Sequence, residues 1–266
     1  MLIEARNISL DVPDMSHHVL VGQRRKLRIL RNVSIALKKG ETVGLVGESG
    51  SGKTSLGRSL LRLHEPSEGQ ILFDGQEITH ASAAELKPLR RRMQMIFQDP
   101  QSSLNPRHTI GSILATALKL NGMDASDKSI AAVLDRVGLP SSAIRRYPHQ
   151  LSGGQRQRVG IARAVALKPD FVVADEIVSG LDVSTQAQVL DLLKGLRSEM
   201  GLALAFISHD LSVVRSLCER VVIMKDGQII EEGGTAEVFA APRTAFTRTL
   251  IDSIPLPEVR PGWLDS

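Results

Sequence analysis

Residues 47–54 read Gly-Glu-Ser-Gly-Ser-Gly-Lys-Thr and fit the pattern G-x4-G-K-[ST], whose chemistry is the binding of a triphosphate. Backbone N–H groups can surround phosphate oxygens only where no Cβ blocks their approach, which accounts for the glycines. Lys53 supplies a mobile cation for the β- and γ-phosphates, and the Thr54 hydroxyl is placed to ligate Mg²⁺. The residues expected to contact the triphosphate are Gly47, Glu48, Ser49, Gly50, Ser51, Gly52, Lys53, Thr54 and Ser55.

Two acids, Asp175 and Glu176, directly follow the apolar run at 171–174. If that run is a strand of a parallel sheet, its last side chains lie next to the phosphate loop. Asp175 is suited to hold Mg²⁺ through water, and Glu176 is suited to orient and polarise an attacking water. Alone, this pattern would fit a solvated strand end equally well. The phosphate loop earlier in the chain makes the catalytic interpretation the stronger one.

Two more polar residues follow apolar runs. His209 comes after 202–207 and could hydrogen-bond the γ-phosphate or the water held by Glu176, although a lone histidine is more often structural or merely exposed. Gln98 comes after 93–97, and its amide oxygen can ligate Mg²⁺. By composition alone, a surface glutamine is the better interpretation of Gln98.

The elements that must position these residues follow from hydrophobic patterning. Strands are predicted at 2–12, 28–38, 42–46, 171–174 and 202–207, and helices at 54–63, 110–120, 126–137, 157–167 and 184–200. Two Asp-Gly pairs, at 74–75 and 226–227, predict hairpins. Strands that alternate with helices indicate a parallel α/β core, and the helical stretch from 105 to 150 indicates an insertion into it. Residues 13–27 are expected to form a loop, and 252–266 a loosely structured tail.

Composition limits the class of protein. The 266 residues are 42% apolar and 23% charged, so disorder of the whole chain is excluded. The net charge of +4 is spread among interspersed acids and bases, which indicates no nucleic-acid groove. One cysteine, Cys218, excludes an intramolecular disulfide. No run of about 18 apolar residues predicts a membrane-spanning helix, and the N-terminus lacks the pattern of a signal peptide.

A second anion-binding turn, Leu-Ser-Gly-Gly-Gln at 151–155, precedes another predicted helix. Because the chain already has one triphosphate site, this second phosphate-binding turn needs a different explanation. With this motif, the chain resembles the ATP-binding subunits of ABC transporters over roughly residues 2–250. The matching elements stand in family order: Walker A at 47–54, the Q-loop Gln98, the signature at 151–155, Walker B at 171–175 with Glu176, the D-loop at 179–182 and the switch His209.

The resemblance implies a P-loop NTPase (RecA-like) core, an N-terminal antiparallel β region and an inserted α-helical subdomain. It places the core at about 1–98 and 168–240, the helical subdomain at about 99–167 and a C-terminal tail at about 241–266, all within a single ABC ATPase domain over 1–266. It also implies ATP and Mg²⁺ as cofactors, with Glu176 and His209 catalytic and with Thr54, Gln98 and Asp175 around the metal.

In the mechanism that the resemblance implies, two such domains bind head to tail. ATP on the Walker A loop of one is covered by the signature of the other, which here is Ser152, Gly153, Gly154 and Gln155, with Asp182 in the D-loop. The implied partners are a second ATPase subunit (a heterodimer in preference to a homodimer), two transmembrane permease subunits and an extracytoplasmic solute-binding protein, with no nucleic acid. The implied location is peripheral, at the cytoplasmic face of the inner membrane.

Within the family, the segments at 97–106, 208–214 and 246–251 resemble importer ATPases for oligopeptides, dipeptides and nickel. Two departures leave an alternative open. Ile177 stands where the family usually has Pro after the glutamate, and no aromatic residue occurs near Val12, where the family stacks adenine; His17 or His18 could replace it. A nucleotide-binding partner subunit with little hydrolysis of its own is therefore the alternative. A soluble ABC protein of DNA repair or translation would need coiled coils or a second cassette.

Overall fold

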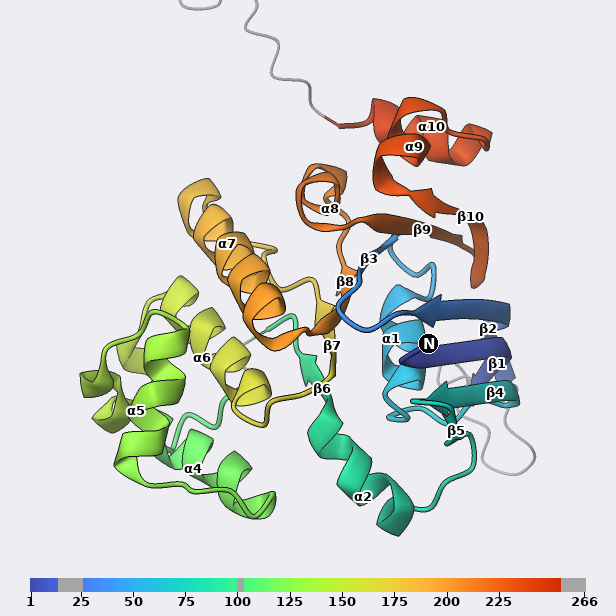
Figure 1. Ribbon diagram of the computed structural model, residues 1–266. Coiled ribbons are helices and arrows are strands. Elements are labelled where there is room, and N and C mark those ends of the chain that lie inside the picture. Colours follow the sequence, from blue (N-terminus) through green and yellow to red (C-terminus); the bar gives the residue numbers. More distant parts are fainter. Residues whose placement is uncertain (14–25, 100–102, 255–266) are drawn as a thin grey trace, which may run out of the picture.

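The computed structural model describes residues 1–13, 26–99 and 103–254 (Figure 1). Most of the loop expected at 13–27, including His17 and His18, and the tail after residue 254 lie outside the described residues. Within the described ranges, no helix combines the length and the apolarity needed to cross a bilayer.

Two sheets form the core. The first is antiparallel, in the order β2-β1-β4-β5, and its strands are β1 (Ile3–Pro13), β2 (Lys26–Leu37), β4 (Glu68–Phe73) and β5 (Gln76–Glu77). The second has the order β10-β9-β3-β8-β7-β6 and is parallel except for β10. Its strands are β3 (Thr42–Val46), β6 (Met93–Ile96), β7 (Phe171–Asp175), β8 (Ala203–Ile207), β9 (Arg220–Lys225) and β10 (Gln228–Gly234).

Every residue of β3, β7 and β8 is buried, as continuous apolar runs in a parallel sheet require. Helix α1 (Lys53–Leu60) contacts β7 and β8 of the parallel sheet and β1 and β2 of the antiparallel sheet. It can approach so closely because Gly57 faces the sheet, where a Cβ would lie 2.8 Å from the Val173 side chain. The helix therefore joins the two sheets directly after the phosphate loop.

In the part of 99–167 that the structure describes, the stretch predicted as a helical insertion contains α4 (Ile110–Leu120), α5 (Asp127–Arg136), two short 3-10 helices (Ser141–Arg145 and Pro148–Gln150) and α6 (Gly153–Val165). These helices lie on the side of the parallel sheet away from β1 and β2 (Figure 1). Helices α4 and α5 begin at the side-chain caps Thr109 and Ser126. They end before Gly122 and Gly138, which adopt left-handed φ values of 66° and 68°. Helix α7 (Val183–Met200) ends likewise at Gly201.

Among the described residues, the helices that were not predicted from sequence include α2 (Ala83–Arg92), α8 (Leu211–Leu217), α9 (Thr235–Ala240) and α10 (Ala245–Asp252). Helix α2 contains Pro88 and buries only Leu86, so it shows no apolar stripe; a capping box between Ser82 and Glu85 begins it. The other three span six to eight residues, which is too short for a helical period to stand out in the sequence. The helix predicted at 54–63 ends earlier, at Leu60, because Arg62 adopts a left-handed φ of 51°.

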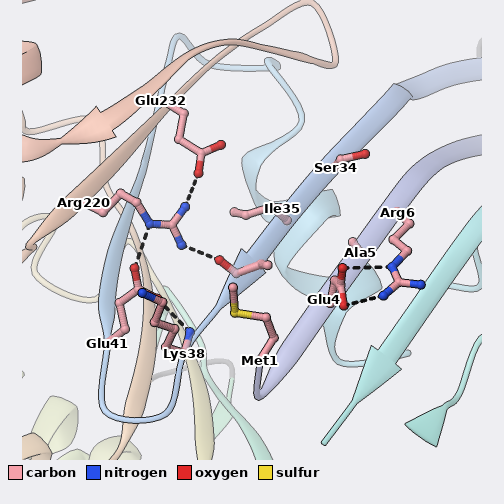
Figure 2. Close-up of a pocket in the computed structure, with 11 residues that line it drawn as sticks. Met1, Glu4, Ala5, Arg6, Ser34, Ile35, Lys38, Glu41, Arg220 and Glu232 are labelled. Atoms are coloured by element: carbon pink, nitrogen blue, oxygen red, sulfur yellow. Dashed lines mark hydrogen bonds and ion pairs between the residues drawn. The ribbon is translucent and has the colours of Figure 1, made fainter. Parts of the chain in front are cut away.

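Arg220 links the two sheets at one end of β9 (Figure 2). Its guanidinium donates to the Glu41 carboxylate at 2.7 Å, pairs with Glu232 of β10 and donates to the Ala36 carbonyl of β2. Bidentate and multiple contacts of this kind suit a planar guanidinium with several donors. The β9–β10 hairpin is thereby attached to β2 at its base.

The packing of α8 on the parallel sheet generates a first prediction. A Cβ on Gly44 of β3 would lie 2.4 Å from the Val214 side chain and 3.2 Å from the Cys218 sulfur. We expect Gly44→Ala to lower the free energy of unfolding by about 1–3 kcal/mol because this core has no room for the methyl group. Gly195, in α7, is the matched control, since its Cβ would meet none of the described atoms within 4 Å. Gly195→Ala should stabilise the chain by up to about 1 kcal/mol through helix propensity. Urea unfolding checks both values, and equal effects would contradict this account of the packing.

Candidate functional site

The phosphate loop connects β3 to α1 and has a backbone that side chains would disfavour. Gly47, Gly50 and Gly52 have φ values of 154°, 80° and 99°, in the region that favours glycine. Gly52 is the N-cap of α1 and offers no side-chain cap. The N–H groups of the first helical turn lack intrahelical partners, so they and the positive end of the helix dipole are available to an anion.

The neighbours of these glycines refine the sequence interpretation. A Cβ on Gly47 would lie 2.1 Å from the Met224 carbonyl oxygen, and one on Gly52 would lie 3.3 Å from the Ile29 carbonyl oxygen. At Gly50 a Cβ would meet no described atom within 4 Å. The protein's own backbone therefore excludes a side chain at Gly47 and crowds one at Gly52, so these glycines serve the packing of the loop as well as the approach of a phosphate.

Lys53 lies over the loop. Its Nζ donates to the carbonyl oxygens of Gly47 and Glu48, both at 2.8 Å, and the residue is 6% exposed. Burial lowers the pKa of the Lys53 ammonium, while the nearby carboxylates of Glu176 and Asp175 raise it. A buried cation held by two carbonyl groups and the Ser51 hydroxyl of its own loop, all of them uncharged, fits an anionic ligand, because phosphate oxygens would supply counter-charge.

Asp175, at the end of β7, meets the loop through Thr54, whose Oγ1 donates to Asp175 Oδ1 at 2.9 Å. Burial raises the pKa of Asp175, and the hydrogen bond from Thr54 opposes that shift. These adjacent oxygens fit Mg²⁺, which is commonly bound by one or two protein oxygens together with phosphates and water. No cluster of three or more His, Cys, Asp or Glu residues that could hold a metal occurs among the described residues.

The side chains of Gln98 and His209 both contact one carboxylate oxygen of Glu176. The Gln98 amide Nε2 donates to Glu176 Oε2 at 3.0 Å, and His209 Nδ1 lies 3.5 Å from the same oxygen. These residues are 78 and 33 positions from Glu176 along the chain and follow β6 and β8, which flank β7 in the sheet. The parallel order of these strands brings the three side chains together.

The turn after Glu176 does not depend on a proline. Glu176 has a left-handed φ of 47°, and its N–H donates to the Ile207 carbonyl at 3.0 Å. Its own carbonyl accepts from the Ser179 N–H at 3.1 Å, and Ile177 is 1% exposed in the core. Apolar packing of Ile177 therefore holds the turn at which the family usually has Pro.

A cavity of about 360 Å³ lies beside the loop. Its walls are formed by Ser49, Gly50, Gly52, Lys53, Thr54, Ser55, Gln98, Glu176 and Ile29. Ile29 was not predicted as a site residue, because an apolar residue in a predicted strand gives no sign that it lines a cavity. Val12, near which the family carries an aromatic, packs against the core instead.

The signature residues lie elsewhere in the chain. Ser152 and Gly153 are exposed, and Ser152 is the N-cap of α6. Ser152 Oγ accepts from the Gln155 N–H at 3.3 Å, while Gln155 Oε1 accepts from the Ser152 N–H at 3.1 Å. Gly153 lines a cavity of about 410 Å³ that does not include the phosphate loop. Gln98 lines both this cavity and the one beside the phosphate loop, but neither of the two contains both the signature and the loop.

Asp182 of the D-loop caps α7. It accepts hydrogen bonds from Ser184 Oγ at 2.6 Å, Thr185 Oγ1 at 2.7 Å and the Thr185 N–H at 2.9 Å, which hold its pKa well below the usual range. Thr185 in turn packs on the signature, because a Cβ on Gly154 would lie 2.4 Å from Thr185 Cγ2. The D-loop and the signature are thus joined through α7.

The opposite pKa shifts of Asp175 and Asp182 generate a second prediction. Since the fold raises the pKa of Asp175, its ionised form destabilises the folded chain at neutral pH, and Asp175→Asn should raise Tm by roughly 1–3 °C. The gain should vanish as the pH falls below the ordinary carboxyl pKa of about 4. Asp182 is the control: its lowered pKa stabilises the fold above that pH, so Asp182→Asn should lower Tm. Thermal unfolding from pH 4 to pH 8 checks both, and a lower Tm for Asp175→Asn at pH 7 would contradict this assignment.

The sequence of the chain is similar to proteins of one family. The profile of the ABC transporter family matches residues 30–179. Putative peptide import ATP-binding proteins of Brucella ovis and Brucella abortus are 52% identical over 235 residues, which cover 87% of this chain and 74% of theirs. The glutathione import ATP-binding protein GsiA of Salmonella typhi is 49% identical over 235 residues, 87% of this chain and 38% of its own length.

Solved structures show the same fold. A dimeric ATP-binding cassette in a post-hydrolysis state, bound to ADP and Pi, has a TM-score of 0.76 at 29% identity and covers 88% of this chain and 98% of its own. The cbiO1 protein of Clostridium perfringens, part of the ABC transporter complex cbiONQ, has a TM-score of 0.75 at 26% identity, with 90% of each chain covered. This chain therefore belongs to the ABC transporter family and is one of its ATP-binding, ATP-hydrolysing cassettes with the P-loop NTPase fold.

Proposed function

We propose that the chain is the ATPase subunit of an importer for peptides or a similar small solute, and that it couples closure of an ATPase dimer to transport through membrane subunits. The observation that carries the proposal is the convergence of Gln98 and His209 on the Glu176 carboxylate beside the cavity at the phosphate loop. The peptide and glutathione import relatives support the solute class. No feature described here favours nickel.

In this mechanism the N–H groups of residues 47–55 and the Lys53 ammonium bind the phosphates. Thr54, Asp175 and the Gln98 amide oxygen would hold Mg²⁺, which when bound neutralises charge on the β- and γ-phosphates. Glu176 orients the attacking water and accepts its proton, since it is a carboxylate at the edge of the cavity. His209, whose side chain is 62% exposed, donates a hydrogen bond toward the transferred phosphoryl group.

The second half of the site comes, in this proposal, from another ATPase subunit. Ser152 Oγ already accepts the Gln155 N–H, so its hydroxyl proton is the part that can be donated to a γ-phosphate oxygen. Gly153 presents an exposed backbone beside it, and the α6 dipole adds positive potential. Gly154, Gln155 and Asp182 would hold this surface in shape. The exposure of the signature supports its action in trans.

The two parts of the chain would have different roles in the assembled transporter. The core at about 1–98 and 168–240 would bind nucleotide, and the helical subdomain at about 99–167 would carry the signature, followed by the tail from about 241. The partners would be a second, different ATPase subunit, two transmembrane permease subunits and an extracytoplasmic solute-binding protein. The chain would then work peripherally at the cytoplasmic face of the inner membrane.

The assigned role of Glu176 gives a third prediction. Glu176→Gln keeps the shape of the side chain but removes the base, so we expect kcat to fall by about 10²–10⁴-fold while ATP affinity changes little. Phosphate release by the assembled complex and equilibrium binding of ATP measure the two quantities. Glu199→Gln, on an exposed glutamate paired with Arg136, is the control and should leave both unchanged. Unchanged hydrolysis in Glu176→Gln would remove Glu176 from the mechanism.

The importer assignment gives a fourth prediction, which is measured in cells. Cells that depend on this chain should take up a labelled di- or tripeptide and should lose that uptake in the Glu176→Gln variant, because closure would no longer be followed by hydrolysis. Uptake of an unrelated sugar serves as the control. Full peptide uptake in the variant cells would contradict the coupling of hydrolysis by this subunit to peptide import.

A further inference from the structure

The tip of the β9–β10 hairpin touches the phosphate loop, although it lies about 175 residues later in the chain. The Gly227 N–H donates to the Ser51 carbonyl at 3.1 Å. The Gly227 carbonyl accepts from the Arg31 N–H of β2 at 2.9 Å. A single glycine therefore bridges the phosphate loop and the antiparallel sheet through its backbone alone.

Close packing accompanies these hydrogen bonds. A Cβ on Gly227 would lie 2.2 Å from the Ile29 carbonyl oxygen, a backbone atom that cannot rotate away. The start of the loop rests on the same hairpin, since a Cβ on Gly47 would lie 2.1 Å from the Met224 carbonyl oxygen. At the end of the loop, a Cβ on Gly52 would lie 3.6 Å from the Gly227 Cα. The phosphate loop is thus seated on the hairpin at both of its ends.

The hairpin itself is held at two places. Its base is attached to β2 by Arg220, which contacts Glu41, Glu232 and the Ala36 carbonyl (Figure 2). Its tip is attached to β2 by the hydrogen bond between Arg31 and Gly227. A hairpin fixed at both ends can act as a rigid support for the loop.

A second Asp-Gly turn provides an internal comparison. Asp74 and Gly75, between β4 and β5, have φ values of 53° and 81°, and Asp226 and Gly227 have φ values of 48° and 78°. The two turns thus place the same local demand on their glycines. Gly75 is exposed, and a Cβ there would meet no atom of the described chain within 4 Å, whereas Gly227 is buried against Ile29. Only the surroundings differ.

We propose that Gly227 is a positioning residue for nucleotide binding, acting through the phosphate loop. By fixing the Ser51 carbonyl it holds the loop in the one backbone conformation in which the N–H groups converge on phosphate. When only part of the population has that conformation, the apparent affinity falls in proportion. The proposal rests on the proposed binding of nucleotide by residues 47–55.

The test compares Gly227→Ala with Gly75→Ala in the full chain. Both substitutions add the same left-handed strain, but only Gly227→Ala forces the turn away from Ile29 and Ser51. Calorimetric titration with ADP, well below both unfolding temperatures, should show roughly tenfold weaker binding for Gly227→Ala and less than twofold for Gly75→Ala. In the assembled complex, KM for ATP should rise about tenfold in Gly227→Ala, with kcat changed less than threefold.

A measurement on the unmodified chain covers the case in which Gly227→Ala does not fold. Hydrogen exchange followed by NMR should show that ADP slows exchange of the Gly227 amide at least tenfold and leaves the Gly75 amide unchanged. Equal ADP affinity in the two variants, or a Gly227 amide indifferent to ADP, would overturn the proposal. If Lys53→Ala binds ADP as tightly as the unmodified chain, the loop is not the nucleotide site, and the proposed function fails together with this inference.

Discussion

The structure depends on holding residues 47–54 in a backbone conformation that exposes N–H groups to an anion. Such a conformation is costly, because N–H groups of the first turn of α1 lack intrahelical partners and because the Lys53 ammonium is buried among uncharged groups of the loop. The chain meets this cost by packing backbone against backbone: β3 and α1 at the ends of the loop, and the β9–β10 hairpin beneath it. Side chains are excluded at Gly47, Gly52 and Gly227 for this reason. The strands β3 and β9, the helix α1 and the β9–β10 turn therefore hold the backbone of the loop in place.

The electrostatics of the site follow from the same arrangement. Lys53 and Asp175 are both buried. Burial lowers the pKa of Lys53 and raises the pKa of Asp175, and both shifts favour the uncharged form of the side chain. An isolated folded chain therefore keeps opposite charges in a poorly solvated place, where a phosphate and a cation would complete their coordination. Glu176, by contrast, stays partly exposed and touches Gln98 and His209. The proposed binding groups are buried and desolvated, while the proposed catalytic carboxylate is accessible.

Much of this organisation could be predicted from the sequence. Apolar runs in the sequence predicted β3, β7 and β8. The parallel order of those strands then predicted Asp175 and Glu176 beside the loop. Helix α2 could not be predicted, since Pro88 and a polar composition hide it. The two Asp-Gly turns are indistinguishable as sequence, yet one is exposed and the other supports the phosphate loop. Ile29 likewise lines the cavity only because of tertiary packing. Local patterns reveal elements and motifs, whereas contacts between distant backbones require the structure.

In the proposed mechanism, the signature of one subunit completes the ATP site on the phosphate loop of the other. The most direct measurement is a structure of the assembled complex carrying Glu176→Gln, with ATP and Mg²⁺. The account predicts that Ser152 Oγ of this chain lies within hydrogen-bonding distance, about 2.5–3.2 Å, of the γ-phosphate held by the opposing subunit. A fully nucleotide-loaded complex in which Ser152 contacts solvent, far from any phosphate, would contradict it.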